Sequence, residues 1–149
     1  METLKITVKK FDELSLTELY QLLQMRSEVF VVEQNCVYQD MDGKDQKALH
    51  LLVKKESELV AYTRLFAQGD YFEGASFGRV VVNPSFRGLK YGHELVKASL
   101  EAIAKHFGDV KVEISAQKYL LAFYETHGFK AVGEEYLEDG IPHVHMVKL

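Results

Sequence analysis

The sequence predicts an α/β (α+β) fold, in which helices flank both faces of a mixed, mostly antiparallel sheet with a central parallel pair. An apolar run, a segment of helical spacing and a second apolar run follow one another over residues 76–115, which favours parallel pairing. Strand pairs joined by short polar turns, over residues 48–66 and 129–149, favour antiparallel pairing. The length of 149 residues suits one domain, residues 1–149, with a sizeable core.

The N-terminal third of the chain reads as a strand, a helix and a loop. Apolar and polar residues alternate over residues 4–9, which is typical of a strand. Ser15 and Glu18 form a capping-box signature, and the apolar residues that follow at helical spacing predict a helix to about residue 30–33. Residues 34–47 are polar and predict a long loop, a kind of segment that is usually functional or disordered.

The remaining elements are bounded by turn residues. They are strands at 48–55, 59–66 and 76–82, a helix at 89–106, a strand at 110–115, a helix at 117–127, and strands at 129–138 and 141–149. Asn83-Pro84 ends the third of these strands, and Gly128 is suited to cap the helix before it. Asp139-Gly140 is a strong signal for a two-residue hairpin turn.

Composition and charge exclude several classes of protein. The net charge of −4 argues against a general nucleic-acid-binding surface. The single cysteine, Cys36, cannot form an internal disulfide, which fits a reducing compartment. No apolar run approaches the ~20 residues of a membrane span, and the first residues lack the apolar core of a signal peptide. We expect a cytoplasmic protein whose partners include neither nucleic acid nor membrane.

The segment Arg87-Gly-Leu-Lys90-Tyr-Gly92 opens the helix at 89–106 with cations and glycines. A helix N-terminus carries a partial positive charge, so each exposed cation there costs about 0.3–1 kcal/mol. A bound anion would remove this conflict, because free backbone amides and the cations would both hold it. The alternative is that Arg87 and Lys90 only solvate a surface turn.

Two stretches carry a family resemblance. "VVVNPSFRGLKYGHELV" resembles the acetyl-CoA signature of the GNAT acetyltransferase superfamily, and "ISAQKYLLAFYETHGF" resembles the second motif of that family. "RSEVFVVEQNCVYQDMDGKD", "SAQ" and "DGIPHVHM" resemble the ElaA-type subgroup. The resemblance implies a GNAT-type fold and direct acetyl transfer from the co-substrate acetyl-CoA to an amine.

The resemblance also implies roles for particular residues. The backbone of Val80, Val81 and Val82 would hold the pantetheine arm, and Tyr124 would protonate the departing CoA thiolate. The pyrophosphate would bind to these residues: Arg87, Gly88, Leu89, Lys90, Tyr91 and Gly92.

Lys90 departs from the signature, which normally has glycine at this position. If the ligand crosses closely over this residue, the lysine would obstruct it. If the residue already lies in the first helical turn, its φ is negative and no glycine is demanded. We favour the second case, in which Lys90 adds charge near a phosphate.

The sequence offers several candidates for the general base. Glu33 ends the first helix beside the loop where substrates of the family bind, and we place it with Tyr124 as catalytic. His50 begins a strand, where a lone histidine is more often structural, and Glu113 shares a strand face with polar residues. A water relay would need no single base. The substrate pocket is expected to contain Gln34, His50, Arg79 and Gln117.

Arg64 and Arg79 lie inside apolar strands, where an arginine needs a carboxylate partner or a wet cavity. One reading is a pocket that grips a substrate carboxylate or a CoA phosphate. The favoured reading pairs both arginines with Glu33 or with loop carboxylates at 40, 42 and 45. The same acidic loop hints at a cationic acceptor.

Metal and thiol chemistry are not expected. His143 and His145 share one strand face, but no spacing brings further ligands to them, so we expect no metal. Cys36 reads as a small loop or core residue, since the resemblance implies direct transfer.

Two functions from different classes remain open. One is an N-acetyltransferase that acts on a primary amine of a small molecule or peptide, which Tyr124 favours. The other is a non-catalytic acyl-CoA-binding module, which Lys90 favours. A phosphate-binding domain for another nucleotide is a weaker third reading. The C-terminal hairpin could pair across a homodimer, by fold analogy alone.

Overall fold

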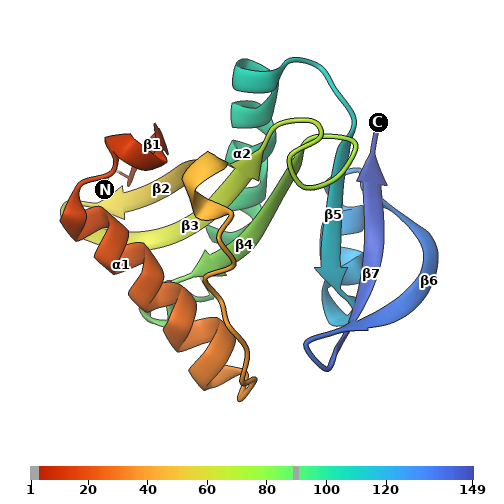
Figure 1. Ribbon diagram of the computed structural model, residues 1–149, viewed down its shortest axis with the longest axis horizontal. Coiled ribbons are helices and arrows are strands. Elements are labelled where there is room, and N and C mark those ends of the chain that lie inside the picture. The colour runs from red at the N-terminus through yellow and green to blue at the C-terminus, as the bar shows by residue number, and fades with distance from the viewer. Residues whose placement is uncertain (1–3, 89–90) are drawn as a thin grey trace.

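The computed structural model describes residues 4–88 and 91–149, which form two sheets and the helices that cover them (Figure 1). The first sheet has the order β1 (Leu4–Lys10), β2 (Leu49–Lys55), β3 (Glu58–Phe66) and β4 (Ser76–Val82), and every pair is antiparallel. The second has the order β5 (Val112–Gln117), β7 (Ile141–Lys148) and β6 (Lys130–Glu138), again antiparallel.

The two sheets meet where β4 and β5 begin. Ala75 and Val112 form a parallel bridge, supported by backbone hydrogen bonds from Ala75 N to Lys111 O (2.9 Å) and from Glu113 N to Ala75 O (2.8 Å). Beyond this bridge the two strands are in separate sheets, and Figure 1 shows them diverging. The parallel pair that the sequence predicts is therefore short, and it opens into a gap.

Helices pack on both faces of the first sheet, as predicted. Leu22, Met25 and Val29, from α1 (Leu16–Arg26) and the turn after it, pack in a buried cluster with Leu52 and Tyr62 of the sheet. The apolar face of α2 (Tyr91–Phe107) packs in the larger core that both sheets share. The mixed α/β fold class is confirmed.

Local signals set several element boundaries. The Ser15 hydroxyl accepts from the Glu18 amide (3.0 Å), and the Glu18 carboxylate accepts from the Ser15 amide (2.8 Å), so the predicted capping box is confirmed. The predicted first helix, however, changes to a π-helical turn, η2, at Ser27–Glu33. Such turns are frequent at functional sites. Short 3-10 turns are η1 (Phe11–Glu13), η3 (Asp45–Lys47), η4 (Pro84–Phe86) and η5 (Lys118–Leu120).

The C-terminal elements depend on turn geometry. Gly128, with φ +92°, lies in the turn that ends α3 (Leu121–Glu125). This helix is shorter than the one predicted over 117–127, because Gln117 belongs to β5 and Lys118–Leu120 form a 3-10 turn. Asp139 (φ 51°) and Gly140 (φ 78°) form the tip between β6 and β7, so the predicted hairpin is confirmed.

None of the helices in the described residues has the length and apolar character needed to cross a membrane.

Candidate active site

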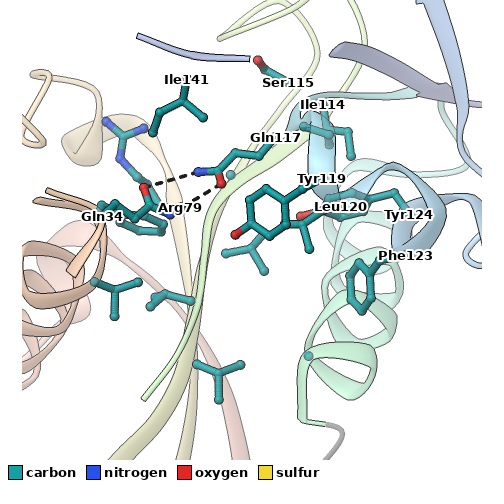
Figure 2. A pocket seen from close by; sticks show the side chains of 18 of the residues that line it. Gln34, Arg79, Ile114, Ser115, Gln117, Tyr119, Leu120, Phe123, Tyr124 and Ile141 are labelled. Atoms are coloured by element: carbon teal, nitrogen blue, oxygen red, sulfur yellow. Dashed lines mark hydrogen bonds between the residues drawn. The ribbon is translucent and has the colours of Figure 1, made fainter. Parts of the chain in front are cut away.

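A cavity of about 760 Å³ lies between the diverging strands β4 and β5 (Figure 2). Residues 77–82 line one side and residues 114–117 the other. The segment around η2, the start of α2, the region of η5 and α3, and the β6–β7 turn complete the walls. One cavity therefore brings together segments from almost the whole chain.

A bulge in β4 helps to open this gap. Tyr62 of β3 pairs with Val81, whereas Arg64 pairs with Gly78, so β4 contains one extra residue there. Arg79 lies in this bulge with a φ of 52°, in the left-handed region. A bulge bends its strand and increases the local twist. The end of β4 is thereby directed away from β5.

The structure brings most of the sequence-predicted site residues to the cavity. The cavity-lining residues among them are Val80, Val81, Val82, Arg87, Gly88, Tyr91, Gly92, Tyr124, Glu33, Gln34, Arg79 and Gln117. Leu89 and Lys90 lie outside the described residues, so the two cases for Lys90 stay open. His50 is not brought to the cavity.

The segment before α2 has space for a ligand. Gly88 has a φ of +84°, and a Cβ at this position would meet no atom within 4 Å, so a side chain is disfavoured by torsion rather than by crowding. Arg87, which precedes it, contacts the opposite wall: its two terminal nitrogens each lie 2.6 Å from an oxygen of Glu33. The hydrogen bond from Arg87 lowers the pKa of Glu33, which makes that carboxylate a weaker proton acceptor.

Tyr124 lines the inner wall from α3. It is 5% exposed, and its ring packs against Phe77 and Phe129, with centroid separations of 6.4 and 6.0 Å. Burial raises the pKa of Tyr124, so its phenol keeps its proton. Among the residues that the structure describes, none hydrogen-bonds to this hydroxyl. A buried phenol with its proton available therefore borders the cavity.

Gln34 and Gln117 meet across the cavity. Their side-chain amides face one another with N–O distances of 3.5 and 3.4 Å, drawn as dashed lines in Figure 2. Gln34 follows η2 and Gln117 ends β5, so this pair connects the first helix to the second sheet.

His50 and Glu113, two sequence candidates for the base, are held elsewhere. His50 is fully buried between the Tyr62 hydroxyl (2.6 Å) and the Asp45 carbonyl (2.9 Å), and burial lowers its pKa. Glu113 accepts from the Gly74 amide (2.6 Å) and lies 2.9 Å from His145 Nε2. Neither lines the cavity, because both have structural partners in the core or in a neighbouring loop.

The two arginines inside the strands of the first sheet bind the acidic loop. Arg64 contacts Asp42 (2.6 Å) and Asp45 (3.0 Å), and Arg79 contacts Asp40 (2.7 Å). The predicted pairing of these arginines with loop carboxylates is confirmed. The hint that the loop attracts a cationic acceptor loses its basis, since all three carboxylates already neutralise arginines of this chain.

Arg26 is a member of the same network that the sequence reasoning missed. It is fully buried at the end of α1 and contacts Asp40 and Asp45, each at 2.8 Å. A signal was present, because Leu19, Leu22 and Arg26 recur at helical spacing on one face.

The turn between β6 and β7 contributes groups that sequence reasoning did not select for the site. Glu138 and His143 line the cavity, with His143 Nε2 3.4 Å from Glu138 Oε2. Ser115 of β5 donates to Glu138 Oε1 at 3.2 Å. Glu138 and His143 flank the predicted hairpin turn, but only the pairing of β5 with β7 brings Ser115 beside them, so the sequence did not single out this group.

The Cys36 thiol has a backbone partner. The Cys36 thiol lies 3.1 Å from the Asp139 carbonyl, which links the long loop to the β6–β7 turn. Within residues 4–88 and 91–149, no group of three or more His, Cys, Asp or Glu side chains is placed to hold a metal ion.

Comparisons with known proteins agree with this arrangement. A family model described as an acetyltransferase (GNAT) domain matches residues 12–149. Protein ElaA of Escherichia coli (strain K12) is 47% identical over 138 residues, which cover 91% of this chain and 90% of that protein.

Solved structures show the same relationship. An acyl-CoA N-acyltransferase from Pseudomonas aeruginosa matches with a TM-score of 0.94 at 43% identity, over 99% of this chain and 100% of that chain. The crystal structure of Escherichia coli ElaA matches with a TM-score of 0.91 at 43% identity and the same coverage. The chain therefore belongs to the GNAT acetyltransferase family, and it resembles the ElaA-type proteins as its motifs predicted.

Proposed function

We propose that this protein transfers an acetyl group from acetyl-CoA directly to a primary amine of a small molecule or peptide. One observation carries the proposal: the cavity between β4 and β5 has the buried Tyr124 phenol in one wall and the glycine-containing start of α2 at its end. An extended thiol ester fits between two separated strand edges, and an anionic group fits at the start of a helix.

The first strand of the gap would hold the acyl-CoA arm. Val80, Val81 and Val82 line the cavity, and β4 is an edge strand of the first sheet, so the backbone polar groups on its unpaired edge would be available to an extended ligand. A backbone amide of this strand would polarise the thioester carbonyl. Arg87, Gly88 and the amides up to Gly92 would hold the pyrophosphate, and the charge of Lys90 would add to this site.

The chemistry requires that protons balance. The amine arrives as an ammonium ion and must lose one proton before its nitrogen attacks the carbonyl carbon. The C–N bond forms, the C–S bond breaks and the sulfur leaves. Tyr124 gives its proton to the sulfur and recovers the second proton that the nitrogen loses as the amide forms. The net products are an amide, a free thiol and one proton released to solvent.

A binding and transfer experiment tests this function. Calorimetry would measure acetyl-CoA affinity, and mass spectrometry would detect acetylated product from a panel of polyamines, amino sugars and peptides. Mass spectrometry is preferred because Cys36 would react with thiol reagents. Acetylated amine is the expected result. Tight binding of acetyl-CoA with no acetylation of any amine would support the alternative, a non-catalytic acyl-CoA-binding module.

A further inference from the structure

The turn between β6 and β7 places a carboxylate and an imidazole together in the wall of the cavity. We propose that Glu138, supported by His143 and Ser115, is the catalytic group that takes the proton from the acceptor ammonium ion. This inference rests on the proposed acetyl transfer, and it names a residue that the sequence reasoning left out.

The other carboxylates of the cavity are less suited to this role. Among the residues that the structure describes, three carboxylate side chains line the cavity: Glu33, Glu138 and Asp139. Both oxygens of Glu33 are held by Arg87, which lowers its pKa and its basicity. Asp139 is exposed at the tip of the turn, and no hydrogen bond from the described residues orients its carboxylate. Of these three carboxylates, Glu138 is the one that a hydrogen bond orients and that pairs with no arginine or lysine among the described residues.

His143 is positioned to share a proton with Glu138. Its Nδ1 lies 2.7 Å from the Ile141 carbonyl oxygen, which can only accept, so Nδ1 carries a hydrogen. In the neutral imidazole, Nε2 then presents a lone pair to Glu138 Oε2, at 3.4 Å. Two acceptors face one another, and a proton placed between them converts this contact into a charge-assisted hydrogen bond. The pair is therefore built to receive one proton.

The His143 side chain is enclosed by the protein, whereas the Glu138 side chain stays partly accessible. The His143 side chain is 8% exposed and the Glu138 side chain is 41% exposed. Ser115 holds Oε1 of Glu138 and also contacts the Tyr136 hydroxyl, and the Tyr136 ring stacks on His143 with a centroid separation of 6.2 Å. A carboxylate has about four lone-pair sites. Sites on Glu138 therefore remain for an ammonium ion in the cavity.

The position of Glu138 and His143 in the cavity suits contact with the acceptor amine rather than with the pyrophosphate of CoA. Figure 2 shows Ser115 and Ile141, which contact this pair, on the upper side of the cavity, and Phe123 on the lower side. Phe123 also packs within 4.5 Å (ring centroids) of His93, in the first turn of α2. The proton acceptor and the proposed pyrophosphate site thus lie toward opposite sides.

The rates with two amines of matched shape distinguish a catalytic base from a residue that has only a structural role. Phenethylamine is an ammonium ion at neutral pH, whereas O-benzylhydroxylamine, in which an oxygen replaces one CH₂, is largely unprotonated there. Transfer to the first needs a proton acceptor before attack, and transfer to the second does not. Acetylated product from each would be measured at saturating acetyl-CoA, after subtraction of the rate without protein.

We expect Glu138→Gln to lower the rate with phenethylamine by about 100-fold or more, as for loss of a general base, while the rate with O-benzylhydroxylamine changes little. The retained second rate would also show that the variant is folded. His143→Gln should produce a smaller loss of the same kind. The matched control is Glu135→Gln on the same strand, because Glu135 pairs with Lys118 (2.6 Å) outside the cavity and should leave both rates unchanged.

Three outcomes would overturn the inference. Glu138→Gln could lower both rates equally, which indicates a structural role, or could lower neither. Alternatively, Glu33→Gln could produce the selective loss, which would identify Glu33 as the base. A wild-type protein that binds acetyl-CoA but acetylates neither of these amines nor any of the polyamines, amino sugars and peptides would contradict the proposed transfer itself, a result distinct from all three.

Discussion

Arg87 and Glu33 connect two walls of the cavity through a bidentate ion pair, with both N–O distances at 2.6 Å. Glu33 ends η2 beside the loop, and Arg87 precedes α2, where the pyrophosphate is proposed to bind. Both side chains are nearly half exposed, at 44% and 45%. A phosphate that uses Arg87 must therefore compete with a carboxylate of the same chain.

This competition predicts that Glu33→Gln tightens acetyl-CoA binding, because Arg87 no longer has to leave a partner. An exposed ion pair contributes about 0.2–1 kcal/mol, so the gain should not exceed about fivefold in Kd. Calorimetry at low salt would measure it. Glu28→Gln is the control, since Glu28 is an exposed carboxylate of η2 outside the cavity wall and tests the effect of charge alone. Equal gains in acetyl-CoA affinity in both variants would contradict a specific competition between Glu33 and the phosphate for Arg87.

Tyr124→Phe should lower turnover by about 100-fold and leave the Kd for acetyl-CoA nearly unchanged. The substitution removes the proton donor but keeps the ring that packs against Phe77 and Phe129. Steady-state rates and calorimetry would separate the two effects. Unchanged turnover would show that the thiolate leaves without this phenol.

The stabilisation that Glu18 contributes to the folded protein should decrease at acid pH. Burial alone would raise the pKa of Glu18, but hydrogen bonds from Lys54 (2.7 Å), the Ser15 amide (2.8 Å) and Lys9 (2.9 Å) outweigh it and lower the pKa to about 2. Because the folded value lies below the ordinary value of 4.5, the stabilisation is complete above that pH. It is lost as the pH falls toward 2.

The corresponding variant is Glu18→Gln, which should lower the free energy of unfolding at pH 6.5 by much more than at pH 3. Urea denaturation at both values would measure the difference between wild type and variant. A difference that does not depend on pH would mean that packing, rather than the carboxylate charge, stabilises this position.

The left-handed backbone at Arg79 predicts that the glycine variant is more stable than the alanine variant, which reverses the order expected in an ordinary strand. Arg79→Ala and Arg79→Gly both remove the contact with Asp40, so this loss cancels between them. At this positive φ alanine is strained and glycine is not, so Arg79→Gly should be the more stable variant by about 1 kcal/mol.

The control for this comparison is Lys5, an exposed residue of β1. There glycine should be less stable than alanine by roughly 0.5–1 kcal/mol, because the strand backbone is ordinary. Chemical denaturation of the four variants would check both orders. The same order at Arg79 as at Lys5 would contradict strain in the bulge.

Much of the fold could be predicted because the signals are local. The capping residues Ser15 and Glu18 mark the first helix, and Asp139-Gly140 marks the last hairpin, since each acts on its own backbone. Boundaries were less certain where helix types change, as at Ser27–Glu33. The apolar residues there continue the helical spacing, so that spacing did not reveal the change to i→i+5 hydrogen bonds.

The sequence by itself determined the element order, the fold class and the family, because hydrophobic periodicity, turn residues and the motif around Arg87 and Tyr124 all lie in short contiguous segments. Only the tertiary structure decided which carboxylates are available to interact with a substrate. It placed the loop aspartates on Arg26, Arg64 and Arg79, held His50 away from the cavity and brought Glu138 to Ser115. The physical reason is that charge partners are chosen by the convergence of loops and strands far apart in sequence, and no local pattern encodes that convergence.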